Sequence, residues 1–415
     1  MTNDKMSTLL NQTKYPAAYR QKDVKVLIKN LISFQPVTII GLPRVGITRI
    51  SRFLFVHPEF LEKELNSQKL ILLEIDINDL FSLDETNFWQ LVLKRIADNN
   101  LVQKELPAAK DLYLTAAQAN DAFTFFDNTK QVVEKLCLQD YCLFFFFNRF
   151  NRTAPLYSFR FFAHFQALKD VAKTKINFLF TSSRPIEHLF PDVFKGANLE
   201  VFSRKYYLKP HSKKDLSAVI QEFENSRKIK LNSKIKEIAY RYSGGHSQYA
   251  LLILQALEKQ NFQLKNIDVA LKGNLDLLAQ SQEIWDFLNQ KEKEILTGQR
   301  ISSQNHFLNK IGLINEKKLL NPIFEDFVKL KTTEENQKIY DLTKKEKALL
   351  LILEGKRGET VPRDELITFV WQSQAEETNN WALDQLIKRL RGKIKLLNLP
   401  YKIVTVRGQG YKLIT

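Results

Sequence analysis

Four short, mainly apolar runs lie in the first half of the chain, at Val37–Ile40, Leu70–Ile75, Tyr141–Phe147 and Ile176–Thr181. Runs of this length with little polar alternation are typical of strands buried on both faces, which occur in parallel sheets covered by helices. The stretches between them are long enough for helices, such as the mostly helical segment up to Leu138. We therefore predict an α/β fold with a parallel sheet over residues 1–205.

From residue 206 onward the apolar spacing becomes mainly helical. We expect residues 206–272 to form a mainly helical region. A second unit, residues 273–331, has the spacing of a small winged helix, and a plain helical linker is the alternative. The stretch Lys331–Lys338 is charged and lacks apolar periodicity, so it is predicted to be a linker.

The last segment, residues 338–415, carries three helical patterns followed by two short strands. Its third helix is predicted over Thr378–Leu397. Gaps of three and four residues place six apolar side chains on one face of that helix, at Leu383, Leu386, Ile387, Leu390, Ile394 and Leu397. The rest of the helix is basic and suits a DNA groove, the alternative being a solvated surface helix. A turn at Gly408–Gly410 then joins the two strands, with Arg407 at its tip.

Charge and cysteine content narrow the class of partner and the compartment. The chain has a formal net charge of +16, and residues 338–415 hold 15 basic against nine acidic residues, so an anionic partner is expected, nucleic acid before membrane. Cys137 and Cys142 form neither a metal motif nor a disulfide framework, which indicates a reducing compartment. The longest apolar run is too short to span a bilayer, and no apolar leader segment is seen, so we expect a cytoplasmic protein.

The C-terminal segment resembles the winged-helix effector domain of OmpR/PhoB-type response regulators. The matching pieces are Leu342–Leu350, Val361–Leu366, Val370-Trp371, Leu383–Arg391 and Thr405–Tyr411, in the order of the family. The resemblance implies a recognition helix in the major groove and a wing in the minor groove of double-stranded DNA. Carried over by position, the implied DNA-binding residues are Trp381, Lys388, Arg389, Arg391, Thr405 and Arg407. Trp381 departs from the family, in which a polar or basic residue is commoner at that position.

A glycine loop follows the first predicted strand. It reads Gly41-Leu-Pro-Arg-Val-Gly-Ile-Thr48 and leads into a helix, so backbone N–H groups and the helix dipole could hold phosphates. Its spacing is that of a phosphate-binding loop, but Ile47 stands where a lysine is expected. The third strand ends in Asn148-Arg149 instead of an acidic pair. The candidate residues of this degenerate nucleotide site are Gly41, Arg44, Gly46 and Thr48, and Arg49 is a second source of substitute charge.

Residues 15–270 resemble signal-transducing P-loop ATPases of the STAND type and their archaeal and origin-recognition relatives. Besides the loop and strands, the resemblance rests on Tyr242-Ser-Gly-Gly-His-Ser247, where Ser247 replaces the usual proline. It implies that residues 206–272 form a helical lid over a P-loop NTPase-like domain. With the loop lysine and the acidic pair missing, phosphoryl transfer loses its main charge-stabilising groups, so a pseudo-ATPase is expected.

These observations predict a DNA-binding transcription regulator whose degenerate P-loop module senses a signal or assembles the protein. The alternative is an enzyme, an ATP-driven STAND-like or initiator-like switch acting on DNA. No cofactor is required by the residues, and ATP or ADP with Mg²⁺ stays open as a ligand. A protein partner or self-association through the P-loop module is the other expected contact. No receiver domain with a phospho-accepting aspartate is recognised, so control by aspartyl phosphorylation is not expected.

Overall fold

The computed structural model describes residues 16, 19–65, 69–156, 158–194, 200–259, 267–297, 306–315, 318–332, 342–371, 379–396 and 401–414. The chain divides into two compact units. The first comprises residues 1–292 with 302–324, and the second residues 293–301 with 325–415. Most of the predicted linker lies outside the described residues.

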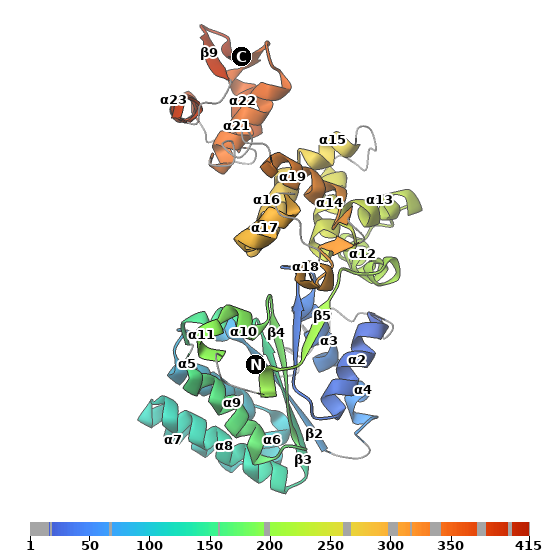
Figure 1. The fold of residues 1–415 in the computed structure, drawn as a ribbon, viewed down its shortest axis with the longest axis vertical. Helices are drawn as coiled ribbons and strands as arrows, with labels where there is room; N and C mark the ends of the chain where they lie inside the picture. The colour runs from blue at the N-terminus through green and yellow to red at the C-terminus, as the bar shows by residue number, and fades with distance from the viewer. Residues whose placement is uncertain are drawn as a thin grey trace. The chain divides into compact units, whose positions relative to one another are not determined.

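A five-stranded parallel sheet forms the centre of the first unit, with the strand order β2-β3-β4-β1-β5 (Figure 1). The strands are β1 (Val37–Gly41), β2 (Lys69–Asp76), β3 (Tyr141–Asn148), β4 (Ile176–Ser182) and β5 (Lys205–Leu208). The prediction of a parallel α/β sheet is confirmed. The fifth strand was not predicted, and it crosses the domain boundary expected at residue 205.

Helices cover both faces of this sheet, as Figure 1 shows. One face packs against α2 (Gln21–Ile32) and α3 (Ile47–Val56), with the short α4 (Glu59–Glu62) beside α2. The other face carries α5 (Glu85–Ala97), α6 (Asn100–Glu105), α7 (Ala108–Ala119), α8 (Ala122–Leu138) and α9 (Phe159–Val171). Short connecting elements are η2 (Ile77–Asp79), η3 (Phe150–Leu156), α10 (Ile186–Leu189), α11 (Pro191–Phe194) and η4 (Glu200–Phe202).

Phenylalanine fills the space between the sheet and α5, α8 and α9. Successive residues of a strand point to opposite faces, so Phe145 and Phe147 of β3 pack here together with Phe178 and Phe180 of β4. The ring centroids of Phe147 and Phe180 lie 5.4 Å apart in a stacked pair. This layer holds the strands in one register and therefore sets the positions of the side chains at their carboxyl ends.

The predicted lid is helical, as expected. It contains α12 (Lys213–Arg227), α13 (Ser233–Ser243), α14 (Ser247–Lys259) and α15 (Ile267–Lys272), and α16 (Leu275–Phe287) follows. Beyond it come α17 (Gln290–Leu296), α18 (His306–Lys310), a hairpin of β6 (Ile314–Asn315) and β7 (Lys318–Leu319), and α19 (Pro322–Thr332). Helices followed by a hairpin suit the small winged helix predicted for residues 273–331, although the division into compact units runs through this segment.

The C-terminal part of the second unit has three helices and a three-stranded antiparallel sheet in the order β8-β10-β9. Its elements are α21 (Lys344–Gly355), β8 (Thr360–Pro362), α22 (Arg363–Trp371), α23 (Asn380–Leu396), β9 (Lys402–Val406) and β10 (Gly410–Ile414). Five of the six side chains predicted for the apolar face of α23 are buried, with Leu383 and Leu390 at 0% exposure, and the sixth, Leu397, lies outside the described residues. The predicted helix and the predicted pair of strands are therefore both present.

Candidate functional sites

The glycine loop joins β1 to α3, as the sequence predicts. Gly46 caps the N-terminus of α3 with φ 104°, a left-handed conformation that favours glycine, and Arg44 also has a positive φ, of 61°. A cavity of about 880 Å³ lies along this loop, and Gly46 and Thr48 line it. Gly41 ends β1 at the start of the loop. The four predicted residues of the degenerate nucleotide site are thus brought together at one loop.

The turn before α14 lies directly on the glycine loop. Because a carbonyl only accepts hydrogen bonds, His246 Nε2 is the donor to Pro43 O, at 2.9 Å. Ser247 Oγ donates to Arg44 O at the same distance. Burial lowers the pKa of His246 to about 4, so the ring is neutral at pH 7. The serine that replaces the expected proline therefore adds a hydrogen bond between the lid and the loop.

Close backbone approach explains the glycine in this turn. A Cβ at Gly245 would lie 2.1 Å from His211 O, and its φ is +82°. The backbone N–H of His211 donates to Gly245 O at 2.8 Å, and His211 Nε2 lies 2.9 Å from Tyr19 Oη. Burial, with Arg20 beside the ring, lowers the pKa of His211 to about 2. The uncharged His211 thus joins the turn at Gly245 to Tyr19, in the segment before α2.

Both arginines proposed as substitute charges form ion pairs, one with α16 and one with α12 of the lid. Arg44 Nε donates to Glu283 Oε2 at 2.6 Å, although the Arg44 side chain is 57% exposed. Arg49 Nη2 lies 4.0 Å from Glu222 Oε2. Both arginines therefore have an acidic partner, although Arg44 remains largely exposed. Their charge is partly balanced by Glu222 of α12 and Glu283 of α16, which line the same cavity.

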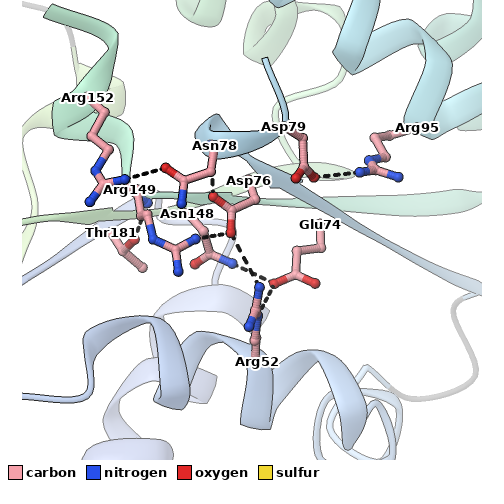
Figure 2. Close-up of polar contacts among 10 residues, drawn as sticks. All are labelled: Arg52, Glu74, Asp76, Asn78, Asp79, Arg95, Asn148, Arg149, Arg152 and Thr181. Atoms are coloured by element: carbon pink, nitrogen blue, oxygen red, sulfur yellow. Dashed lines mark hydrogen bonds and ion pairs between the residues drawn. The ribbon is translucent and has the colours of Figure 1, made fainter. Parts of the chain in front are cut away.

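The carboxyl ends of β2 and β3 carry a network of arginines and acids, drawn in Figure 2. Asn148, fully buried, donates from Nδ2 to Glu74 Oε1 at 2.6 Å. Arg149 pairs with Asp76, and its backbone N–H donates to Thr181 Oγ1 at 2.8 Å. Arg52 reaches both acids, at 3.1 Å to Glu74 and 3.3 Å to Asp76.

The network replaces the acidic pair expected at the end of β3 with acids from β2. Asp76 lies opposite Asn148 in the parallel register of the two strands. Each carboxylate faces a guanidinium group (Figure 2), and a divalent cation placed there would meet positive charge. Among the described residues, no group of three or more His, Cys, Asp or Glu is arranged to hold a metal ion. The acids at this edge of the sheet are therefore already balanced by arginines.

These acids were missed by sequence reasoning, although a signal was available. Glu74 and Asp76 end the second apolar run, and acids at the carboxyl end of a parallel strand lie at the edge of the sheet where ligands bind. Arg52 gave no such signal, because it lies on the helix after the glycine loop and meets Asp76 only in the folded sheet.

The second candidate site is the exposed face of α23. Trp381 is 69% exposed in the first turn, and Lys388 and Arg389 are exposed further along the helix. The core residues of α23 point the opposite way, so these three predicted DNA contacts lie where a ligand can reach them.

The other predicted contacts lie on or beside the wing, the pair β9 and β10. Arg391 donates from Nε to Ile403 O at 3.0 Å and from Nη2 to Thr405 Oγ1 at 2.8 Å. These hydrogen bonds bring Arg391 and Thr405 together and attach the wing to α23. Arg407 is exposed in the turn between the strands. The structure thus gives Arg391 a positioning contact that spacing did not predict.

The first turn of α23 is held by Arg363 at the start of α22. Its Nε donates to Asn380 Oδ1 at 2.7 Å, and its Nη1 to Tyr411 Oη at 3.1 Å. Asp384 accepts from both Arg363 and Tyr411. These contacts join α22, α23 and β10, and they fix the direction of the exposed face.

The C-terminal segment of the chain matches a known family. Residues 336–413 match the family described as "Transcriptional regulatory protein, C terminal". Over 88 residues the chain is 41% identical to the transcriptional regulatory protein CusR of Escherichia coli and 39% identical to the transcriptional activator protein IrlR of Burkholderia pseudomallei. Each match covers 21% of this chain and 38% of the relative. The predicted resemblance of the C-terminal segment to OmpR/PhoB-type domains is confirmed.

The chain is also similar in fold to a Walker-type ATPase of Pyrococcus abyssi. That comparison covers 75% of this chain and 95% of the other, with a TM-score of 0.50 and 16% identity. Such low identity shows the fold alone, and it confirms the P-loop ATPase architecture. Within the described residues, none of the helices combines the length and apolarity that crossing a membrane requires.

Proposed function

We propose that this protein is a transcription regulator that binds duplex DNA through residues 342–414. The observation that carries the proposal is the exposed basic face of α23 beside an attached wing, in a segment that matches a transcriptional-regulator family. A helix of this kind enters the major groove, and a wing-tip arginine such as Arg407 suits the adjacent minor groove. A cytoplasmic site of action, where the chain has access to duplex DNA, is part of this proposal.

The test is binding of the full chain to duplex DNA, followed by fluorescence anisotropy over a range of salt concentrations. Phosphate contacts release counterions, so the affinity should fall steeply as salt rises. A base-reading Lys388 or Arg389 should lose about 1–3 kcal/mol of discrimination when changed to alanine. If either contacts phosphate instead, its alanine variant should bind all sequences more weakly and show a flatter salt dependence.

A matched control is Lys104→Ala. Lys104 is 78% exposed on α6 of the other unit, and removing it changes the total charge by the same amount. It should leave both affinity and salt dependence unchanged. Equal losses for Lys104→Ala and Lys388→Ala, or no salt-sensitive binding by the full chain, would contradict the proposal.

We further propose that the P-loop module does not hydrolyse ATP. Three features support this: Ile47 in place of the loop lysine, Asn148 in place of an acid, and arginines paired with the acids of β2. Phosphoryl transfer depends on positive charge at the transferred group and on a supported metal, and both are weakened here. Any nucleotide would bind through the backbone N–H groups at the N-terminus of α3, independently of Mg²⁺.

The variant Ile47→Lys tests this proposal. Ile47 begins α3 and lines the cavity, so a lysine stem can occupy the same place and direct its ammonium group into the cavity. Calorimetry should detect tighter ATP binding by the variant, with no phosphate release and no dependence on Mg²⁺. Steady phosphate release by the unaltered protein would favour the alternative of an ATP-driven switch acting on DNA.

The module is proposed to serve in assembly or in sensing through a protein partner. Hydrogen bonds from His246 and Ser247 attach the lid to the backbone of the glycine loop, which supports a structural role for the module. Sedimentation of the full chain, with and without ATP, measures self-association. If ATP changes the sedimenting mass, and hence the oligomeric state, the module acts as a switch and not as a purely structural element.

A further inference from the structure

An indole side chain leads the exposed face of α23. Trp381, Gln385, Lys388 and Gly392 follow one another at spacings of four, three and four residues, so they form a single stripe along the helix. The buried residues of α23 occupy the opposite side. Gly392 leaves open space, since a Cβ there would meet nothing within 4 Å. The stripe therefore offers a large apolar group at one end and an accessible backbone at the other.

The helix start that carries this indole is held by Arg363. Arg363 Nη2 donates to Asn380 O at 3.2 Å, and its Nε donates to the Asn380 side chain, next to Trp381 in the sequence. Asp384, one turn later, is held by the same arginine. The start of the helix that carries the exposed indole is therefore held in place on both sides of Trp381.

The charge around the stripe selects the partner. Lys388 and Arg389 are exposed on α23, and Arg407 is exposed at the wing tip. An apolar group surrounded by cations suits a ligand with an anionic backbone and an apolar feature inside a groove. Duplex DNA has both, because the thymine C5-methyl group is the apolar feature of its major groove. Residues at the start of a recognition helix are those that meet base edges.

Building on the proposed DNA-binding function, we infer that Trp381 reads thymine by packing its indole against the C5-methyl group. Cytosine carries no methyl group at this position, and the purines present polar edges instead. The contact would make a thymine at one or two positions of the target site a requirement. It also assigns a role to the residue at which this chain departs from the OmpR/PhoB pattern.

The experiment combines protein and DNA variants. Target sites are selected with the full chain from random duplexes, and each thymine is then replaced singly by deoxyuridine, which removes only the methyl group. The unaltered protein should bind about fourfold more weakly at one or two positions. A fourfold change corresponds to about 0.8 kcal/mol, the free energy of burying one methyl or methylene group. Trp381→Ala should bind the thymine site more weakly and show no further loss with deoxyuridine at those positions.

Two further variants make the result specific. Trp381→Phe retains an aromatic ring and should keep part of the sensitivity to the methyl group. Leu396→Ala removes the other strongly exposed apolar side chain of α23, which is 81% exposed at the opposite end of the helix, and should leave all affinities unchanged. Because both side chains are exposed, thermal unfolding of these variants should match that of the unaltered protein.

The outcomes separate this inference from the proposed function. Absence of salt-sensitive DNA binding by the unaltered protein would remove both. A second outcome is selective DNA binding in which each deoxyuridine lowers the affinity of the unaltered protein and that of Trp381→Ala by the same factor. That outcome would overturn the thymine contact alone. The thymine contact is equally overturned if Trp381→Ala weakens all duplexes by the same factor, as packing on the sugar-phosphate backbone would do, or if no thymine position is sensitive.

Discussion

Replacing Arg149 by alanine should lower the local free energy of unfolding at the carboxyl ends of β2 and β3, by an amount that can be worked out from the structure. Arg149 pairs with Asp76, whose side chain is 8% exposed, while Arg149 itself is 29% exposed. Leaving a buried carboxylate without its partner costs about 3–5 kcal/mol. Because Arg149 is partly solvated and Arg52 still lies 3.3 Å from Asp76, we expect a smaller loss, about 2 kcal/mol.

The rescue variant identifies the cause of this loss. Asp76→Asn removes the charge that Arg149 neutralises, so the double variant Arg149→Ala/Asp76→Asn should lose clearly less than the two single losses added together. The control is Arg95→Ala, which breaks an ion pair with Asp79 that is drawn in the same view (Figure 2). Those side chains are 36% and 46% exposed, so the control should cost below about 1 kcal/mol.

Hydrogen exchange measured by mass spectrometry suits this multi-domain chain, since global unfolding of such chains is not two-state. Amides of β2 and β3 should exchange about 30-fold faster in Arg149→Ala, the equivalent of about 2 kcal/mol, while amides of α21 and α23 stay unchanged. Unchanged exchange in Arg149→Ala, or the absence of rescue by Asp76→Asn, would refute the view that arginines balance the acids of β2.

Three further predictions concern the C-terminal segment. Leu390→Ala should cost about 2–5 kcal/mol by emptying a fully buried position, measured as faster exchange throughout α23, and wild-type exchange would mean that the helix faces are reversed. Gly392→Ala should stabilise α23 by about 1 kcal/mol, because alanine favours a helix more than glycine and the added methyl group meets open space. The same variant should weaken DNA binding if the backbone approaches the duplex there, and a gain in stability with unchanged affinity would exclude that approach. Burial opposes ionisation of Glu346, but hydrogen bonds from Lys393 and Thr343 outweigh this effect and lower the pKa of Glu346. Ionised Glu346 therefore stabilises the fold above the unfolded pKa of about 4.3, and this stabilisation is lost as pH falls through the lower folded pKa. Glu346→Gln should remove that part of the acid dependence in exchange of α21 amides, and an identical pH profile would contradict the assignment.

Local patterns alone were enough to predict most elements of this fold. The apolar runs predicted β1 to β4, because a strand buried on both faces has no polar positions. Spacing of three and four residues predicted the buried face of α23, and Gly408–Gly410 marked the turn of the wing. The glycine loop was also recognisable, because its geometry is encoded within eight consecutive residues. The strand β5 escaped prediction, since it has only four residues, three half-buried and one buried, and so carries little periodic signal.

The partners of the charged residues were decided only by the tertiary structure. Asp76 and Arg149 are 73 residues apart in the chain, and they meet because the parallel register places Asp76 opposite Asn148. The family resemblance implied that Arg391 contacts DNA, but the return of the wing brings Ile403 and Thr405 to its guanidinium group. Periodicity reports which side of an element is buried, whereas ion pairs depend on how distant elements are placed, so the sequence identified the sites and the folded chain determined their charge balance.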